Sequence, residues 1–267
     1  MLGDITIGQY YPADSVLHRL DPRVKFIGTI VFIVSIFLVQ NWGYLICTGF
    51  LAAMIVISKV PFRFMIKGLK AVLILLIFTA IMNLLLTPGE VLWQAGILRI
   101  TKEGIFTACF MAIRFSFLIL GASIMTLTTT PNKLTDGLEN LFSPLKVIHF
   151  PVHEIAMMMS IALRFIPIIM EETDRIMKAQ MARGADFESG NIIKKAKAMI
   201  PILVPLFVSA FRRASDLALA MEARCYHGDK GRTHMKPLKY HGRDAGGYIV
   251  LLLYLAAIIV TRILLGF

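Results

Sequence analysis

Charged residues are missing from long stretches of this chain. Only 17% of its 267 residues are charged, whereas 57% are hydrophobic. That balance excludes a water-soluble globular domain and is typical of an integral membrane protein. The longest apolar runs contain no acidic residue and lie at residues 26–58, 71–89, 104–132 and 245–261. Because Gln-Asn-Trp-Gly at 40–43 divides the first run, we interpret it as a tight helical hairpin, and the four runs predict five transmembrane spans.

The chain also lacks the sequence signatures of a catalytic subunit. It has no Gly-x-x-x-x-Gly-Lys-Ser/Thr motif, so it cannot bind ATP through a P-loop. Its three cysteines, Cys47, Cys109 and Cys225, are too widely spaced to predict a disulfide framework or a zinc site. A zinc-protease helix begins as His153-Glu154 does, but Met157 stands where its second histidine belongs. We therefore expect no catalytic residue, no metal site and no cofactor in this chain.

The basic residues follow membrane topology rather than a nucleic-acid surface. The net charge is +11, but the sequence has no basic stripe with interleaved aromatic residues. Instead, Arg19, Arg23 and Lys25 precede the first predicted span, and further basic residues lie at 59–70, in the predicted loop between the second and third spans. By the positive-inside rule both segments are cytoplasmic. The prediction is a multi-pass protein of the cell membrane with lipid contacts, a cytoplasmic N-terminus, a C-terminus outside and no nucleic-acid partner.

One charge lies within a predicted span. Arg114 is about ten residues into the fourth span, close to the middle of the membrane. Because a charge at that depth is costly, the side chain should face protein rather than lipid. Two roles remain open for it: a structural pairing with a helix end or with carbonyl groups, and a part in transport.

Between the fourth and fifth spans, apolar residues recur at intervals of three and four positions. This periodicity predicts two long amphipathic helices, from about 153 to 183 and from about 192 to 224, after a shorter helix at 132–142. Pro167, Pro201 and Pro205 predict kinks in the long helices. Because their opposite faces are charged, we expect these helices to lie in the cytoplasm or on the membrane surface rather than to span.

The predicted fold class is therefore an all-α integral membrane protein. It has about five transmembrane helices plus two long and one short cytoplasmic amphipathic helices. Three parts follow along the chain: a membrane domain of four spans at 1–130, a cytoplasmic domain at 131–244 and a last transmembrane helix at 245–267.

Both long helices are predicted to end in nearly the same sequence. Residues 179–184 read Ala-Gln-Met-Ala-Arg-Gly and residues 220–225 read Ala-Met-Glu-Ala-Arg-Cys, with the two arginines 41 residues apart. A single arginine at a helix C-terminus usually only complements the helix dipole. Two copies, each beside small alanines, favour docking of two similar partners, because arginine is a frequent interface anchor. The repeat indicates force transmission rather than chemistry.

Three sequence motifs together point to a family. They are the entry segment Pro-Ala-Asp-Ser-Val-Leu-His-Arg-Leu-Asp-Pro-Arg-Val-Lys at 12–25, the run Leu-Arg-Phe-Ile-Pro at 163–167, and the paired Ala-Arg ends. In this order they resemble the transmembrane T component of energy-coupling factor transporters, over essentially the whole chain. The resemblance implies two partner ATP-binding-cassette ATPases, which bind ATP and Mg, and a small S component that binds a vitamin or a metal ion.

The resemblance also implies which residues bind these partners. The two ATPases would dock on the helix ends, at Ala182, Arg183, Gly184, Ala223, Arg224 and Cys225. Cys225 stands where the first motif has glycine, which leaves the geometry of the second end open. The expected S-component contacts are apolar residues of the long helices: Met157, Met158, Met159, Phe165, Phe207 and Phe211.

As a bacterial, non-catalytic subunit, the chain would transmit ATPase motion to the S component for uptake of a vitamin or micronutrient. The alternative is the permease of a conventional ATP-binding-cassette importer with its own substrate path. Such a permease would carry one coupling segment per chain, whereas this sequence has two.

Overall fold

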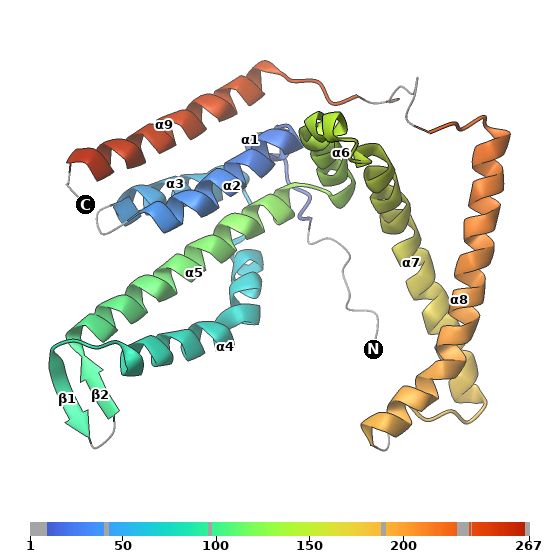
Figure 1. The fold of residues 1–267 in the computed structure, drawn as a ribbon, viewed down its shortest axis with the longest axis horizontal. Helices are drawn as coiled ribbons and strands as arrows, with labels where there is room; N and C mark the ends of the chain where they lie inside the picture. The colour runs from blue at the N-terminus through green and yellow to red at the C-terminus, as the bar shows by residue number, and fades with distance from the viewer. Residues whose placement is uncertain are drawn as a thin grey trace. The chain divides into compact units, whose positions relative to one another are not determined.

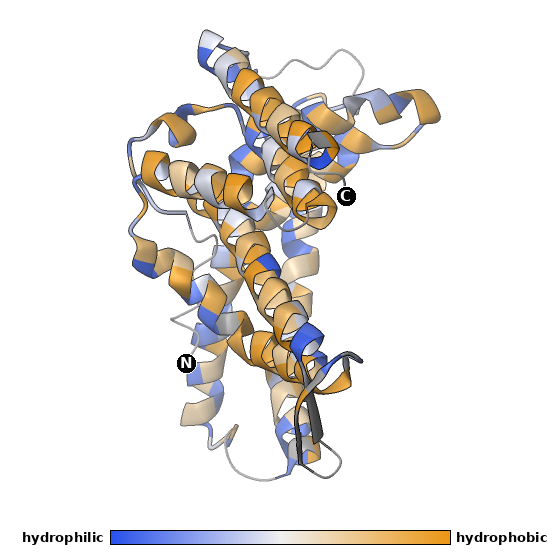
Figure 2. Ribbon diagram, turned by 90° about the vertical axis from the view of Figure 1, so that its left-hand side faces the viewer, coloured by the Kyte–Doolittle hydropathy of each residue, from blue (hydrophilic) through white to orange (hydrophobic). Residues whose placement is uncertain are grey.

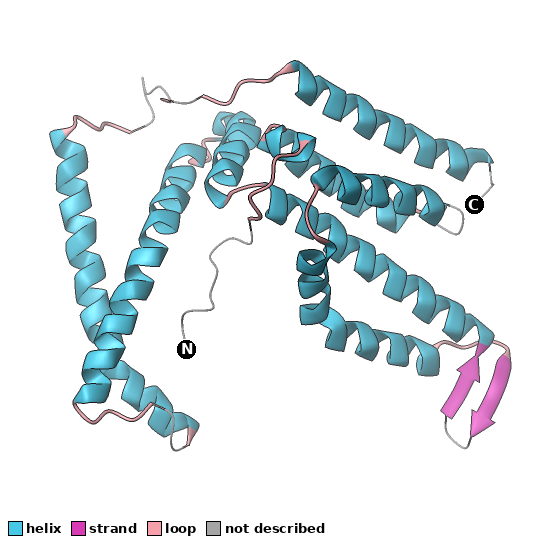
Figure 3. Cartoon of the chain, turned by 180° about the vertical axis from the view of Figure 1, so that it is seen from behind, coloured by secondary structure: helices cyan, strands magenta, loops and turns pink. Residues whose placement is uncertain are grey.

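The structure is a computed structural model that describes residues 10–39, 43–95, 98–187, 191–228, 235 and 237–264. Helices form nearly all of its regular structure (Figures 1 and 3). The predicted class of an all-α membrane protein is confirmed, and a short hairpin of two strands between α4 and α5 is an addition to it. The chain divides into two compact units. We call residues 138–237 the α7–α8 unit and the described residues before and after them the larger unit; the predicted three-part division stays a prediction.

The larger unit is a bundle of apolar helices. Its elements are α1 (Val16–Arg19), α2 (Pro22–Leu38), α3 (Gly43–Ser58), α4 (Phe62–Leu86), β1 (Val91–Ala95), β2 (Leu98–Thr101), α5 (Lys102–Thr128), the first part of α6 (Pro131–Phe142) and α9 (Gly242–Leu264). Helix α5 packs against α2, α3 and α4, while α9 packs against α2 and α3. The two strands pair antiparallel, with Trp93 opposite Ile100.

Polar caps determine where two of these helices begin. The Asp21 carboxylate accepts a hydrogen bond from the Arg23 amide at 2.9 Å, and Pro22 occupies the first position of α2, where no amide donor is needed. The Thr101 hydroxyl accepts a hydrogen bond from the Gly104 amide at 3.0 Å and so caps α5.

The core of the larger unit contains a small group of paired polar atoms. Ile36 and Cys47 have no exposed surface. The Tyr254 hydroxyl of α9 lies 2.6 Å from Ser35 Oγ of α2 and 3.3 Å from Cys47 Sγ of α3. Three helices therefore share one hydrogen-bonded contact, as buried polar groups require.

Length and composition identify the helices that are able to cross a membrane. In the larger unit these are α5 and α9; the two halves of α4, bent by 58°, pass the same test together, as a broken span or a re-entrant loop. Helices α2 and α3, of 17 and 16 residues, are at the short end for a span. Figure 2 shows apolar residues along the helices. The basic residues at 63–70, predicted to lie in a loop, instead belong to the first half of α4, which begins at Phe62.

The α7–α8 unit contains the two predicted long helices. After the 3-10 turn η1 (Ser143–Ile148), α7 spans Val152–Ala182 and α8 spans Ile192–Ala223. By length and composition, each contains an 18-residue stretch apolar enough to cross a membrane, so its charged face does not exclude a span. Residues 198–211 of α8, for example, carry no charge. Charge alone does not exclude spanning, and the cytoplasmic location stays a prediction.

Candidate partner-binding site

The first motif forms a tight helical stop at the end of α7. Arg183 is the last half-helical residue, and Gly184 follows with φ +88°, in the left-handed region that favours glycine. The Gly184 amide donates to the Met181 carbonyl at 2.9 Å, and the Ala185 amide donates to the Gln180 carbonyl at 3.0 Å. These two bonds define a Schellman motif, which satisfies carbonyls that the helix leaves unpaired.

The second motif forms the same stop at the end of α8, although it lacks the glycine. Cys225 takes the left-handed conformation with φ +56°. Its amide donates to the Glu222 carbonyl at 2.9 Å, and the Tyr226 amide donates to the Met221 carbonyl at 3.1 Å. The two ends are therefore built alike, and the question left open by the sequence is answered. A non-glycine residue in this region costs about 1 kcal/mol.

Both helix ends present their arginines to the surroundings. All six residues predicted to bind the ATPases, Ala182, Arg183, Gly184, Ala223, Arg224 and Cys225, are exposed. Neither arginine forms an ion pair with another described residue. With small alanines beside each guanidinium, a partner surface can close around the helix end, and the charge remains available for a carboxylate or carbonyl acceptor.

An ion pair joins the two long helices at equivalent positions. Glu172 Oε2 of α7 accepts a hydrogen bond from Arg213 Nη2 of α8 at 2.8 Å. Glu172 precedes Arg183 by eleven residues, and Arg213 precedes Arg224 by the same number. At the rise of an α-helix, each motif lies about 16 Å beyond this ion pair. Figures 1 and 3 show the two helices crossing each other. The segments that run from this junction to the two helix ends, which we call the arms, are therefore of equal length.

Comparison with known proteins places this architecture in a family. The family model described as "Cobalt transport protein" (CbiQ) matches residues 13–235. A relative from Ruminiclostridium cellulolyticum is 56% identical over 241 residues, covering 90% of each chain, and one from Clostridium kluyveri is 52% identical over the full length of both chains. A Bacillus subtilis relative is 47% identical, covering 97% of this chain and 98% of its own. All three carry the name energy-coupling factor transporter transmembrane protein EcfT. The chain belongs to the EcfT family. It is thus a bacterial, multi-pass membrane component of a transporter.

In this EcfT family member, most of the predicted S-component contacts lie on uncovered parts of the long helices. Met158, Met159, Phe207 and Phe211 are exposed, with 73% of the Phe211 surface accessible, whereas Met157 and Phe165 are half-buried. Phe207 and Phe211 are four residues apart and share one face of α8. Bare aromatic surface of this kind indicates a contact with lipid or protein.

Two residues that the sequence raised for other roles have structural partners. Arg114 faces protein, as expected, but its partner is neither a helix end nor a carbonyl. Its Nε donates to the Tyr44 hydroxyl at 3.0 Å, and its guanidinium lies 5.8 Å from the centre of the Phe37 ring. His153, which opens the partial zinc-protease pattern, is buried with Nδ1 at 2.8 Å from Glu139 Oε1.

Sequence reasoning missed the Glu172–Arg213 ion pair. Helical spacing directed attention to charge pairs within each helix, whereas this pair is formed between helices. The repeat itself could have indicated this pair. Glu172 and Arg213 occupy the same position relative to their Ala-Arg motifs and are 41 residues apart, as the two motif arginines are.

Proposed function

We propose that this EcfT family member couples two ATPase subunits to a substrate-binding S component during uptake of a vitamin or micronutrient. The observation that carries the proposal is the pair of equivalent helix stops at Arg183 and Arg224, each exposed and each eleven residues from the Glu172–Arg213 junction. Two equivalent sites on one chain suit two similar partners, whereas a conventional permease needs only one coupling segment.

The proposed mechanism is mechanical. The partner ATPases bind ATP and Mg and approach each other, and each holds one helix end through its arginine. Because α7 and α8 are joined where they cross, displacement of the ends changes the angle between the helices. The exposed apolar faces around Met158, Met159, Phe207 and Phe211 then present a different surface to the S component, which reorients and releases its substrate inward.

Charge reversal at the helix ends tests this function. Replacing Arg183 or Arg224 by Glu removes an anchor and adds a repulsive charge, with a loss on the order of 2 kcal/mol or more per interface. The double variant should lose ATPase co-purification and uptake, yet insert in the membrane, because both side chains are exposed.

Matched controls reverse exposed arginines within the same helices. Arg164→Glu in α7 and Arg212→Glu in α8 change the same charge away from the ends and should keep assembly. Normal assembly and uptake with both end arginines reversed would reduce Arg183 and Arg224 to helix caps. Tight, saturable binding of a vitamin by the purified chain alone would instead support the permease alternative.

A further inference from the structure

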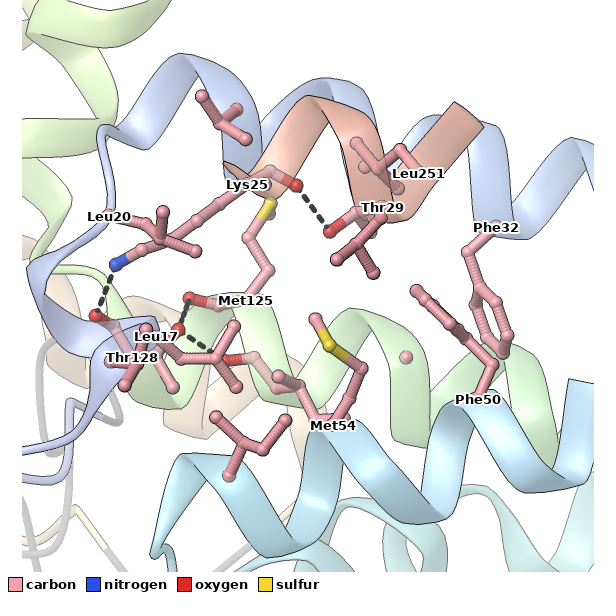
Figure 4. A pocket seen from close by; sticks show the side chains of 18 of the residues that line it. Leu17, Leu20, Lys25, Thr29, Phe32, Phe50, Met54, Met125, Thr128 and Leu251 are labelled. Atoms are coloured by element: carbon pink, nitrogen blue, oxygen red, sulfur yellow. Dashed lines mark hydrogen bonds between the residues drawn. The ribbon is translucent and has the colours of Figure 1, made fainter. Parts of the chain in front are cut away.

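The larger unit contains a cavity that the proposed coupling function does not use. Its volume is about 370 Å³, and it lies among α1, α2, α3, α5 and α9. Figure 4 shows Phe32, Phe50, Met54, Met125 and Leu251 around it, so most of its wall is hydrocarbon. An apolar cavity of this size does not hold water well, but it accepts an apolar ligand.

Cationic side chains lie at one end of this cavity. The Lys25 stem runs along its wall, and the ammonium donates to the Thr128 carbonyl at 2.9 Å (Figure 4), to the Thr129 hydroxyl at 3.2 Å and to the His18 carbonyl at 3.5 Å. All three acceptors are neutral, so the ammonium keeps its charge while its three donors are used. Arg243, in the first turn of α9, also lines the cavity and is exposed.

The two acidic residues nearby are engaged with backbone amides. Asp21 accepts from the Arg23 amide, and Asp244 accepts from the amides of Asp21 at 2.8 Å and His241 at 2.7 Å. Their carboxylates therefore serve as caps for the starts of α2 and α9. Asp21 Oδ1 also lies 3.6 Å from Arg23 Nε, so the cations of Lys25 and Arg243 outnumber the one remaining carboxylate, that of Asp244. A cavity with an apolar body and a net positive charge at one end suits an anionic amphiphile.

We propose that this cavity binds one acyl chain of an anionic glycerophospholipid, with the phosphate against the exposed Arg243 guanidinium, at the end that also carries the Lys25 charge. Lys25 belongs to the basic cluster that the positive-inside rule assigns to the cytoplasm, where the leaflet is rich in anionic lipid. Lipid would thus fill the space between the helices and hold α2 and α9 at a fixed separation. The proposal does not depend on the ATPase or S-component assignments.

Gly246 provides a variant that adds bulk to the cavity wall. It lines the wall, and a Cβ built there meets no atom within 4 Å, so Gly246→Leu adds a side chain beside the cavity without displacing a neighbour. The change also removes a glycine from inside α9, which favours the helix. Gly49 is the matched control, because it lies inside α3, has equally open space around its Cβ and does not line the cavity. Arg243→Gln removes the exposed cation alone.

The experiment is native mass spectrometry of the full-length chain, delipidated in detergent and titrated with dioleoyl-phosphatidylglycerol or dioleoyl-phosphatidylcholine. Wild type and Gly49→Leu should retain one phosphatidylglycerol, and phosphatidylcholine should bind more weakly. Gly246→Leu should lower phosphatidylglycerol affinity at least about tenfold, and Gly246→Ala much less. Arg243→Gln should lower it about fivefold and leave phosphatidylcholine unchanged.

Other results would overturn the proposal. If Gly246→Leu retained phosphatidylglycerol as well as the wild type does, the acyl-chain site would be ruled out. If the wild type bound the two lipids with equal affinity, recognition of the anionic head group would be ruled out. Displacement of the lipid by glycerol 3-phosphate would indicate a head-group site without a chain. A thermal melt of each lipid-free variant controls for misfolding, and phosphatidylglycerol should raise the melting temperature of Gly49→Leu but not of Gly246→Leu.

Discussion

The ion pair at the crossing of α7 and α8 should determine how well the two helices move together. Glu172 Oε2 lies 2.8 Å from Arg213 Nη2, and the two side chains are 25% and 37% exposed, respectively. At that exposure a single ion pair contributes about 0.2–1 kcal/mol, because solvent screens it and two long side chains lose freedom. Reversing one partner removes this attraction and adds a repulsion of similar size, so Glu172→Arg or Arg213→Glu should destabilise the junction by about 1–2 kcal/mol.

The double reversal Glu172→Arg/Arg213→Glu restores opposite charges across the junction and therefore isolates the interaction between the two residues. We expect a coupling energy of about 2–3 kcal/mol in a double-mutant cycle, close to the sum of the two single losses, because the double variant recovers most of them. The assay is substrate uptake per ATP hydrolysed by the assembled transporter in proteoliposomes. Each single variant should assemble with its ATPases, because the end arginines are unchanged, but should transport less substrate per ATP. The double variant should recover most of the loss.

High salt offers an internal check on the same reasoning. Since the pair is partly exposed, raising the ionic strength should reduce the difference between single and double variants. Additive effects of the two reversals would refute the reasoning, because they would show that the residues do not act on each other. Uptake per ATP unchanged in all variants would mean that the arms transmit force without this junction.

The long helices were predictable because their signals are local and agree with one another. Apolar spacing of three and four residues indicated α7 and α8, and Gly184 marked the end of α7, where the left-handed turn occurs. Internal prolines did not end either helix. At α8 the same turn forms on Cys225, because the two capping bonds form there without a glycine. Residue type alone could not settle that end.

Other features depend on contacts between distant residues and were not accessible from local patterns. The start of α4 at Phe62 was missed because basic residues suggested a loop, although long basic side chains on a helix can extend toward the membrane surface. The Tyr44 partner of Arg114 comes from another helix, as does the Arg213 partner of Glu172. The cavity beside Lys25 is formed by five helices, none of which indicates it alone.

Two further predictions concern the helix ends. In a background in which the other two cysteines are serines, exposed Cys225 should react with an impermeant maleimide only after the cell membrane is opened, and bound ATPases should protect it; labelling from outside would reject the proposed topology. Replacing the glycine of one cap and introducing a glycine in the other should change amide hydrogen exchange in opposite directions. Gly184→Ala places a Cβ at φ +88°, at a cost of about 1 kcal/mol, so the Ala185 amide should exchange its hydrogen about fivefold faster. Cys225→Gly relieves the same conformation and should slow exchange at the Tyr226 amide, whose bond to the Met221 carbonyl closes that cap. If neither substitution changed the hydrogen-exchange rate of its amide, the two helix stops would be held by packing rather than by their left-handed residues.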